Sequence, residues 1–176
     1  IMVSKHQHNI ELTYLGCAGF IIEYQHKSIL FDPFISNPTL FNFNKKYTSW
    51  TAVVPEEKLK TIDMVAISHG HYDHCYDTKN LIPFIQSNSK IIGDQSVINE
   101  LYPIFSNNSL QASALQFDKL QTWQYNTDST FRIFPLQSIH SPHIGKLEFF
   151  KGSFLTPQSE IPNKIWQWKK GEDYSY

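Results

Sequence analysis

The chain has 176 residues, of which 41% are hydrophobic and 18% are charged, and its formal net charge at pH 7 is −1. This length supports one hydrophobic core and is short for two independent domains, so we expect residues 1–176 to form a single domain. A near-neutral chain lacks the basic surface of a dedicated nucleic-acid-binding protein. No apolar run approaches the about 20 residues of a transmembrane helix, so no membrane span is expected.

The first third of the sequence alternates between apolar and polar residues, which predicts an antiparallel meander. The expected strands are residues 10–15, 20–24 and 28–31, joined by short turns. The third strand ends at Asp32-Pro33, because proline cannot continue a β-ladder. Residues 35–55 show no clear periodicity and are expected to form a long loop, of the kind that often carries function.

The middle of the chain alternates strands with helices, and strands return towards the end. The segments expected to be helical are 55–60, 78–87 with Asp77 or Thr78 as its N-cap, and 96–105 with an interruption near Pro103. The segments expected to be strands are 63–67, 90–93, 111–116, 121–125, 130–136 and 146–150, with a further strand beginning at 174–176. This order predicts an α/β (α+β) fold in which helices cover one face of a sheet and a second sheet layer covers the other.

Residues 68–74, Ser-His-Gly-His-Tyr-Asp-His, place three histidines and one aspartate directly after a buried strand. Imidazole nitrogens and carboxylate oxygens suit zinc, iron or manganese, and three or four such ligands with an open position are typical of catalytic sites. His69 and His71 can point to the same side of an extended loop, with Gly70 permitting a tight backbone. Asp73 and His74 are adjacent and tend to diverge. The spacing therefore predicts two neighbouring metal sites.

Two further histidines, His140 and His143, follow the alternating strand 130–136. Because His69 also follows a strand end, His140 and His69 can meet at one rim of the sheet. The alternative for His140 is a hydrogen-bonded surface histidine. For His143 we expect either a substrate contact or alternative ligand, or a polar residue that supports the ligands.

His69-Gly-His71-Tyr-Asp73-His74 resembles the HxHxDH signature of the metallo-β-lactamase superfamily. Residues 12–20 and 29–33 resemble the opening strands of that superfamily, and residues 61–68 resemble its strand before the motif. Within the superfamily the chain is most similar to uncharacterised hydrolases near the ascorbate-phosphate lactonase and N-acyl-phosphatidylethanolamine phospholipase D groups. The resemblance implies a four-layer αββα sandwich of two similar halves, of which this chain would hold the first half and part of the second.

The resemblance also implies roles for individual residues. His69, His71 and His140 would bind one metal ion. Asp73 and His74 would belong to the second, and Asp73 would also be catalytic, orienting the nucleophile or receiving its proton.

Outside the motif, the resemblance implies that Asp32 steadies the motif loop through hydrogen bonds. The alternative for Asp32 is a plain strand-ending Asp-Pro turn. Cys17 stands where relatives often carry a histidine, and Cys75 is expected to be a buried small side chain. The two cysteines are far apart in the sequence, so we expect no disulfide framework and slightly favour a cytoplasmic location.

The function implied is a metal-dependent hydrolase in which a metal-bound hydroxide attacks a small-molecule ester, lactone or phosphodiester. The expected cofactor is one or two Zn²⁺ ions, with Mn²⁺ or Fe as alternatives. Four aromatic residues of the loop 35–55 would help to choose the substrate: Phe41, Phe43, Tyr47 and Trp50.

One departure from the superfamily pattern leaves a second function open. The second metal normally also uses an aspartate and a histidine from the C-terminal half, and no histidine follows His143 here. We therefore expect the N-terminal part of a larger protein. The alternative to a hydrolase is a non-catalytic metal-binding fragment or association module, which would pair with a second chain or with a missing C-terminal half.

Overall fold

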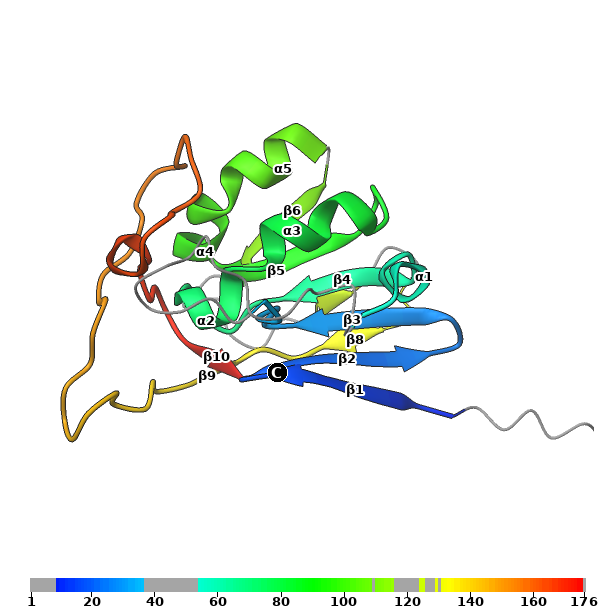
Figure 1. The fold of residues 1–176 in the computed structure, drawn as a ribbon, viewed down its shortest axis with the longest axis horizontal. Coiled ribbons are helices and arrows are strands. Elements are labelled where there is room, and N and C mark those ends of the chain that lie inside the picture. The colour runs from blue at the N-terminus through cyan, green and yellow to red at the C-terminus, as the bar shows by residue number, and fades with distance from the viewer. Residues whose placement is uncertain are drawn as a thin grey trace, which may run out of the picture.

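The computed structural model describes residues 9–36, 54–108, 110–115, 124–125, 129 and 131–175. Its centre is a six-stranded sheet in the order β1-β2-β3-β4-β5-β6 (Figure 1). The strands are β1 Glu11–Gly16, β2 Gly19–Tyr24, β3 Lys27–Phe31, β4 Ile62–Ala66, β5 Lys90–Asp94 and β6 Gln111–Leu115. The first three pair antiparallel and the last four pair parallel, so the predicted meander and the alternating βα order that follows it form one mixed sheet.

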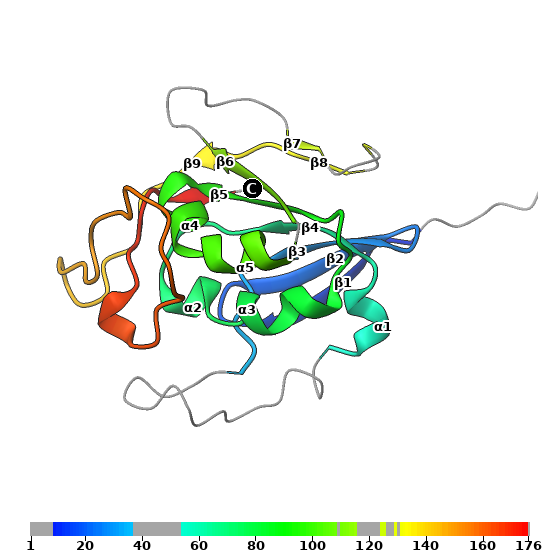
Figure 2. The ribbon, with the colours of Figure 1, turned by 90° about the horizontal axis from the view of Figure 1, so that it is seen from above.

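Helices cover one face of this sheet, as the sequence predicts (Figure 2). They are α1 Glu56–Leu59, α2 Tyr72–Cys75, α3 Thr78–Leu81, α4 Gln95–Glu100, α5 Tyr102–Asn108 and the 3₁₀ helices η2 Ile82–Phe84 and η4 Ile165–Gln167. The helix predicted over 96–105 breaks at Leu101 instead of near Pro103. Pro103 lies in the first turn of α5, where a missing backbone donor costs little. Within the described part of the chain, no helix has the length and apolar character to cross a membrane.

Two short strand pairs lie on the other face of the sheet (Figure 2). They are β7 Gln124–Tyr125 with β8 Arg132–Ile133, and β9 Leu136–Gln137 with β10 Tyr174–Ser175. The predicted strand 130–136 is therefore divided, with Pro135 in the gap between β8 and β9. The strand predicted over 146–150 is wrong, because Gly145 takes a left-handed φ of 59° and the chain turns back there.

The central strand β4 shows why both layers form. Val65 and Ile67 point into the larger core, beneath the helices. Met64 and Ala66 point into a smaller core that includes Ile133 of β8. A strand buried on both faces reads as a continuous apolar run, which is the pattern that precedes the histidine cluster.

Candidate metal centre

The histidine-rich motif begins where β4 ends and continues into α2. His69 and His71 lie in the connecting loop, whereas Asp73 and His74 lie in the helix and not in a loop. Gly70 lies against another part of the chain, and its N–H donates to the Lys170 carbonyl at 2.7 Å. A Cβ at Gly70 would collide with the backbone of Lys169 and come within 2.9 Å of a Glu100 carboxylate oxygen. The glycine therefore lets the loop pass beneath this segment.

The C-terminal strand β10 brings His140 to the motif. The Tyr174 N–H donates to the Ser68 carbonyl at 3.0 Å, and the Ser138 N–H donates to the Asp173 carbonyl at 2.8 Å. β10 thus lies between the end of β4 and the segment that leaves β9. His140 follows two residues after Ser138, which places its ring at the same rim of the sheet as His69.

Three imidazoles, His69, His71 and His140, converge there, and we call them the three-histidine group. His71 Nδ1 lies 3.1 Å from His69 Nε2 and 3.1 Å from His140 Nε2. Tetrahedral zinc with Zn–N bonds of about 2.0–2.1 Å separates its nitrogens by about 3.3–3.4 Å. The observed spacing is close to that value.

The hydrogen bonds around the group leave nitrogen lone pairs facing its centre. Ser68 Oγ donates to Asp32 Oδ2 at 2.7 Å, so its lone pairs can accept the His69 Nδ1–H at 3.1 Å and leave His69 Nε2 unprotonated. His140 Nδ1 lies 3.7 Å from Glu148 Oε1, which favours the proton on that nitrogen. With the His71 proton on Nε2, which has no hydrogen-bond partner among the described residues, all three nitrogens can direct a lone pair to one ion, so the donor set fits a metal ion.

Burial favours the neutral form of His69 and His71, which is the form that binds a cation. His69 is 4% exposed and His71 is 2% exposed. Burial, with the nearby His140 imidazole as the next cause, lowers the pKa of His71 to about 4. Burial and the neighbouring histidines, His74 first, also lower the pKa of His69 well below its usual value. Neutral imidazole is the form that coordinates a metal.

A second set of ligand atoms lies beside the first and comes from Cys17, Asp73 and His74; we call it the mixed group. Asp73 Oδ2 lies 3.8 Å from Cys17 Sγ and 3.9 Å from His74 Nε2. The rings of His69 and His74 have centroids 3.9 Å apart, so the two groups are adjacent.

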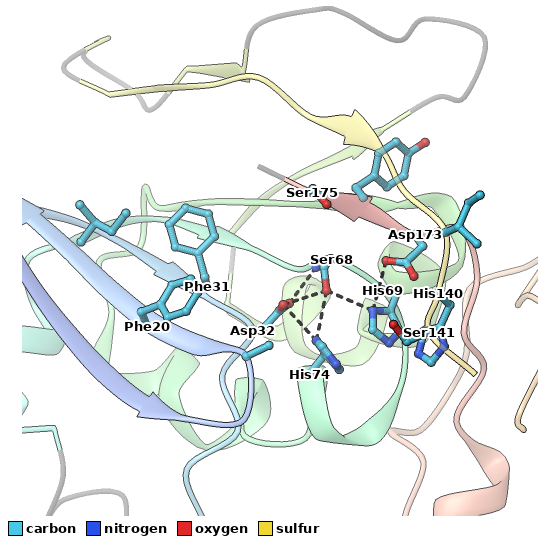
Figure 3. A pocket seen from close by; sticks show the side chains of 14 residues that line it. Phe20, Phe31, Asp32, Ser68, His69, His74, His140, Ser141, Asp173 and Ser175 are labelled. Carbon is cyan, nitrogen blue, oxygen red and sulfur yellow. Dashed lines mark hydrogen bonds and ion pairs between the residues drawn. The ribbon is translucent and has the colours of Figure 1, made fainter. Parts of the chain in front are cut away.

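Asp32 links both groups through its carboxylate (Figure 3). Its Oδ1 accepts the Ser68 N–H at 2.7 Å, and its Oδ2 lies 3.0 Å from His74 Nδ1. Burial lowers the pKa of His74, but the hydrogen bond and charge of Asp32, with the charge of Asp73, outweigh it and raise that pKa above 6.5. A proton on Nδ1 leaves Nε2 to face the mixed group. Asp32 takes a left-handed φ of 38°, a conformation that aspartate tolerates.

A cleft of about 460 Å³ opens beside the centre. Its polar side carries Asp32, His69, His74, His140 and Asp173, which gather in Figure 3. Its apolar side carries Phe20, Ile22, Phe31 and Ile139. The cleft therefore offers ligand atoms next to an apolar wall.

His143 lies outside both groups. Its ring stacks on that of His140, with centroids 4.9 Å apart and planes at 25°, and its Nδ1 accepts the Phe149 N–H at 3.2 Å. His143 is exposed, and its role as a substrate contact, alternative ligand or supporting residue stays a prediction. The four aromatic residues expected to select the substrate lie in 37–53, outside the described residues.

Some residues of the centre escape prediction from the sequence. Asp173 Oδ1 lies 3.5 Å from His69 Nδ1, and Lys170 Nζ donates to Glu148 Oε1 at 2.8 Å. Hydrogen bonds from Lys170 and Lys151 lower the pKa of Glu148 to about 2, so this carboxylate stays charged beside His140. Only Ser68 carries a sequence signal, because a hydroxyl stands directly between the strand and the first histidine.

Comparison with known proteins relates the chain to metal-dependent hydrolases. The chain is 39% identical over 66 residues to a UPF0173 metal-dependent hydrolase of Aeropyrum pernix, covering 38% of this chain and 22% of that protein. It is 32% identical over 93 residues to a UPF0173 metal-dependent hydrolase of Carboxydothermus hydrogenoformans, covering 52% and 34%. The matches thus span about a third or less of these relatives.

Among solved structures, the metallo-beta-lactamase fold protein YhfI from Bacillus subtilis has a TM-score of 0.53 and 20% identity, covering 76% of this chain and 54% of that one. This likeness confirms the predicted fold class, with the chain spanning about half of the neighbour. The family described as "Beta-lactamase superfamily domain" matches residues 27–153, most of the chain and all of the histidine motif. The predicted resemblance is therefore confirmed, and the chain belongs to the beta-lactamase superfamily.

Proposed function

We propose that the chain carries the metal centre of a metal-dependent hydrolase acting on a small-molecule ester, lactone or phosphodiester. The observation that carries the proposal is the convergence of three imidazole nitrogens, 3.1 Å from one to the next, at the wall of a cleft. The names of the UPF0173 relatives support the same class of reaction.

The donor set favours zinc, with Mn²⁺ or Fe as alternatives, because imidazole nitrogens suit borderline metals. A divalent ion held by the three-histidine group would polarise a carbonyl or phosphoryl oxygen and acidify a water molecule. Asp73 is the residue that we assign to proton transfer, since its side chain is 33% exposed and lies 3.9 Å from His74, which lines the cleft. Asp32 and Ser68 hold the histidines in orientation.

The cleft restricts the substrate that fits this reaction. Phe20 and Phe31, whose ring centroids lie 5.8 Å apart, form an apolar wall that favours an apolar group of the substrate. An ester, lactone or phosphodiester that carries an apolar group therefore fits this cleft.

Metal content and hydrolysis measured on the same protein test the proposal. A zinc site with four ligands binds with about 10–16 kcal/mol, so loss of one ligand costs about 3–4 kcal/mol. We expect His71→Ala to weaken zinc binding by several hundredfold, measured against a chromophoric chelator, and to abolish hydrolysis of nitrophenyl esters and lactones. The matched control is His26→Asn, because His26 is exposed in the β2–β3 turn and has a φ of 63° that asparagine tolerates. Equal metal binding by the two variants would refute the proposal.

Exposed apolar side chains on one face of the sheet favour a second function, association with another part of the polypeptide or with another chain. Leu12 and Tyr14 of β1 are each 65% exposed and pair with Ile22 and Phe20 of β2. We infer that a further part of the polypeptide or a second chain covers this face, since such apolar patches mark interfaces. Light scattering tests pairing with a second copy. We expect Leu12→Lys to lower the mass of the particle, whereas a wild-type protein that is already monomeric, with the same mass as Leu12→Lys, would exclude such pairing.

A further inference from the structure

Cys17 is the one residue of the mixed group that lies outside the histidine motif. It belongs to the turn between β1 and β2, and it is 56 residues away from Asp73 in sequence. Its thiol nevertheless points to the Asp73 carboxylate, with Sγ 3.8 Å from Oδ2. We propose that Cys17 is a thiolate ligand of a second metal ion, which Asp73 and His74 bind beside the three-histidine group. This inference rests on the metal centre proposed above and adds a ligand to it.

The distances suit coordination by sulfur. With Zn–S of about 2.3 Å and Zn–O of about 2.0–2.2 Å, a tetrahedral ion separates sulfur and oxygen by about 3.6 Å. The observed 3.8 Å between Cys17 Sγ and Asp73 Oδ2 is close to that separation. All three ligand atoms of the mixed group lie within 4.8 Å of one another. Small rotations of the exposed Cys17 side chain and the partly exposed Asp73 side chain bring these atoms to one ion with His74.

The turn that carries Cys17 is held against the motif. The Tyr14 hydroxyl donates to the Cys17 carbonyl at 3.1 Å. A Cβ at Gly19 would come within 2.8 Å of the Asp32 carbonyl, so only glycine allows the turn to approach the end of β3 this closely. The thiol is therefore fixed on the side of the sheet where Asp32 orients His74.

The three donors have complementary chemistry. His74 directs Nε2 to the group because Nδ1 is bonded to Asp32, and Asp73 supplies a negative oxygen. On binding, the thiol would release its proton to solvent and the sulfur would share an electron pair with the ion. A sulfur donor favours zinc or cobalt over manganese and magnesium. The proposal thus predicts a selectivity that the histidine motif alone does not.

The other cysteine provides an internal control. Cys75 is fully buried, and its Sγ donates to the His69 carbonyl at 3.3 Å, away from the mixed group. Cys17 is exposed. The chain therefore has one thiol that can bind an ion from solvent and one that cannot.

Titration of the purified chain with Co²⁺ distinguishes the two thiols. We expect a near-ultraviolet sulfur-to-cobalt charge-transfer band that grows with the second equivalent of cobalt. Cys17→Ser should remove the band, weaken the second equivalent by about a hundredfold and leave the first unchanged. Cys75→Ser should keep the band. A band that survives in Cys17→Ser, or that disappears in Cys75→Ser alone, would overturn the proposal.

A second measurement needs no substitution. Without metal, a thiol reagent should modify one cysteine of the folded chain, Cys17, because Cys75 has no exposed surface. Two equivalents of Co²⁺ should slow this modification at least tenfold, whereas Mg²⁺ should not. One outcome separates this inference from the proposed hydrolase centre. If cobalt binds to the wild type and not to His71→Ala, but the rate of Cys17 modification does not change with cobalt, the thiolate assignment is wrong and the proposed metal centre stands. If no cobalt binds at all, both are wrong.

Discussion

The three-histidine group and the mixed group are neighbours on one motif, but they are built in opposite ways. The first consists of imidazole nitrogens, and His69 and His71 are almost fully buried. The second contains a carboxylate and a thiol and is open to water, with Asp73 33% exposed. A buried site tolerates ligands that can be neutral, whereas charged ligands are less costly where water reaches them.

The difference also predicts an order of binding. In the metal-free chain, the Asp73 carboxylate is solvated and accepts a hydrogen bond from Cys17, so the mixed group is stable without an ion. The converging nitrogens of the three-histidine group cannot all find protons, since a neutral imidazole has one N–H. We therefore expect the first ion to bind at the three-histidine group and the second, more weakly, at the mixed group.

Substitution of Gly70 should have the largest effect: we expect it to weaken metal binding at the three-histidine group and to leave binding at the mixed group unchanged. Because a Cβ would collide with the backbone of Lys169, Gly70→Ala must displace the loop that carries His69 and His71. We expect zinc affinity for the first equivalent to fall by about a hundredfold or more, and stability to fall by about 1–3 kcal/mol.

The control for this variant is Gly145→Ala. Gly145 has a left-handed φ of 59° and nothing within 4 Å of its added Cβ, so it reports backbone strain without collision. Zinc titration and urea unfolding should separate the two variants. A Gly70→Ala protein that binds the first ion with wild-type affinity would show that the loop does not depend on this close approach.

Asp32→Asn should have the opposite preference. We expect it to lower metal affinity at the mixed group more than at the three-histidine group. An amide accepts only through its oxygen, so it loses either the bond from the Ser68 N–H or the bonds from the Ser68 hydroxyl and the His74 Nδ1–H together. Asparagine also lacks the negative charge that Asp32 places beside His74. Loss of such a supporting hydrogen bond costs about 10–100-fold in metal affinity. Isothermal titration with Co²⁺ should show this loss at the second equivalent.

Asp63→Asn is the matched control, because Asp63 is also buried in the same sheet but pairs with Lys27, at the opposite end of β4 from the motif. Cobalt binding by Asp63→Asn should match wild type. Equal losses at both equivalents in Asp32→Asn would mean that Asp32 supports the loop as a whole and not His74 in particular.

The sequence predicts the parts of this centre that arise from local pattern. Alternation in residues 10–31 and the apolar run before the motif predict the sheet, and the spacing of His69, His71, Asp73 and His74 predicts two sites. Local pattern fails where distant segments meet. The approach of Asp173 and of the Lys170–Glu148 pair to the histidines depends on β10 pairing with β9, which two short strands cannot reveal in advance.

Cys17 and the segment 146–150 are two places where contacts between distant residues make prediction from local sequence fail. The turn residue Cys17 reads as an isolated thiol until the close packing of Gly19 on β3 brings it to Asp73. Residues 146–150 read as a strand from alternation alone, yet their charged member Glu148 forms ion pairs with Lys151 and Lys170 and faces His140. Partners distant in sequence override local propensity in both places.

Acidification should separate the two groups without any substitution. The pKa of His74 is raised above 6.5, so in the metal-free chain a proton occupies its Nε2 through most of the weakly acidic range. The pKa of His71 is lowered to about 4, so His71 stays neutral until far lower pH. Protons compete with metal only at groups that bind them. The Cys17 thiol must lose its proton to bind at any pH in this range, and His74 must also lose one below its own pKa, so affinity at the mixed group should fall about tenfold per pH unit at first and about a hundredfold per pH unit below the pKa of His74.

Between pH 7.5 and pH 5.5 we therefore expect the second equivalent of zinc to dissociate while the first remains bound. Equilibrium dialysis across this range, with metal analysis of the retained protein, measures both equivalents at once. His74→Gln should remove the second equivalent at every pH and leave the pH profile of the first unchanged. Simultaneous loss of both ions on acidification would contradict the division into a buried neutral group and an exposed charged one, because a single proton-linked site would then control the whole centre.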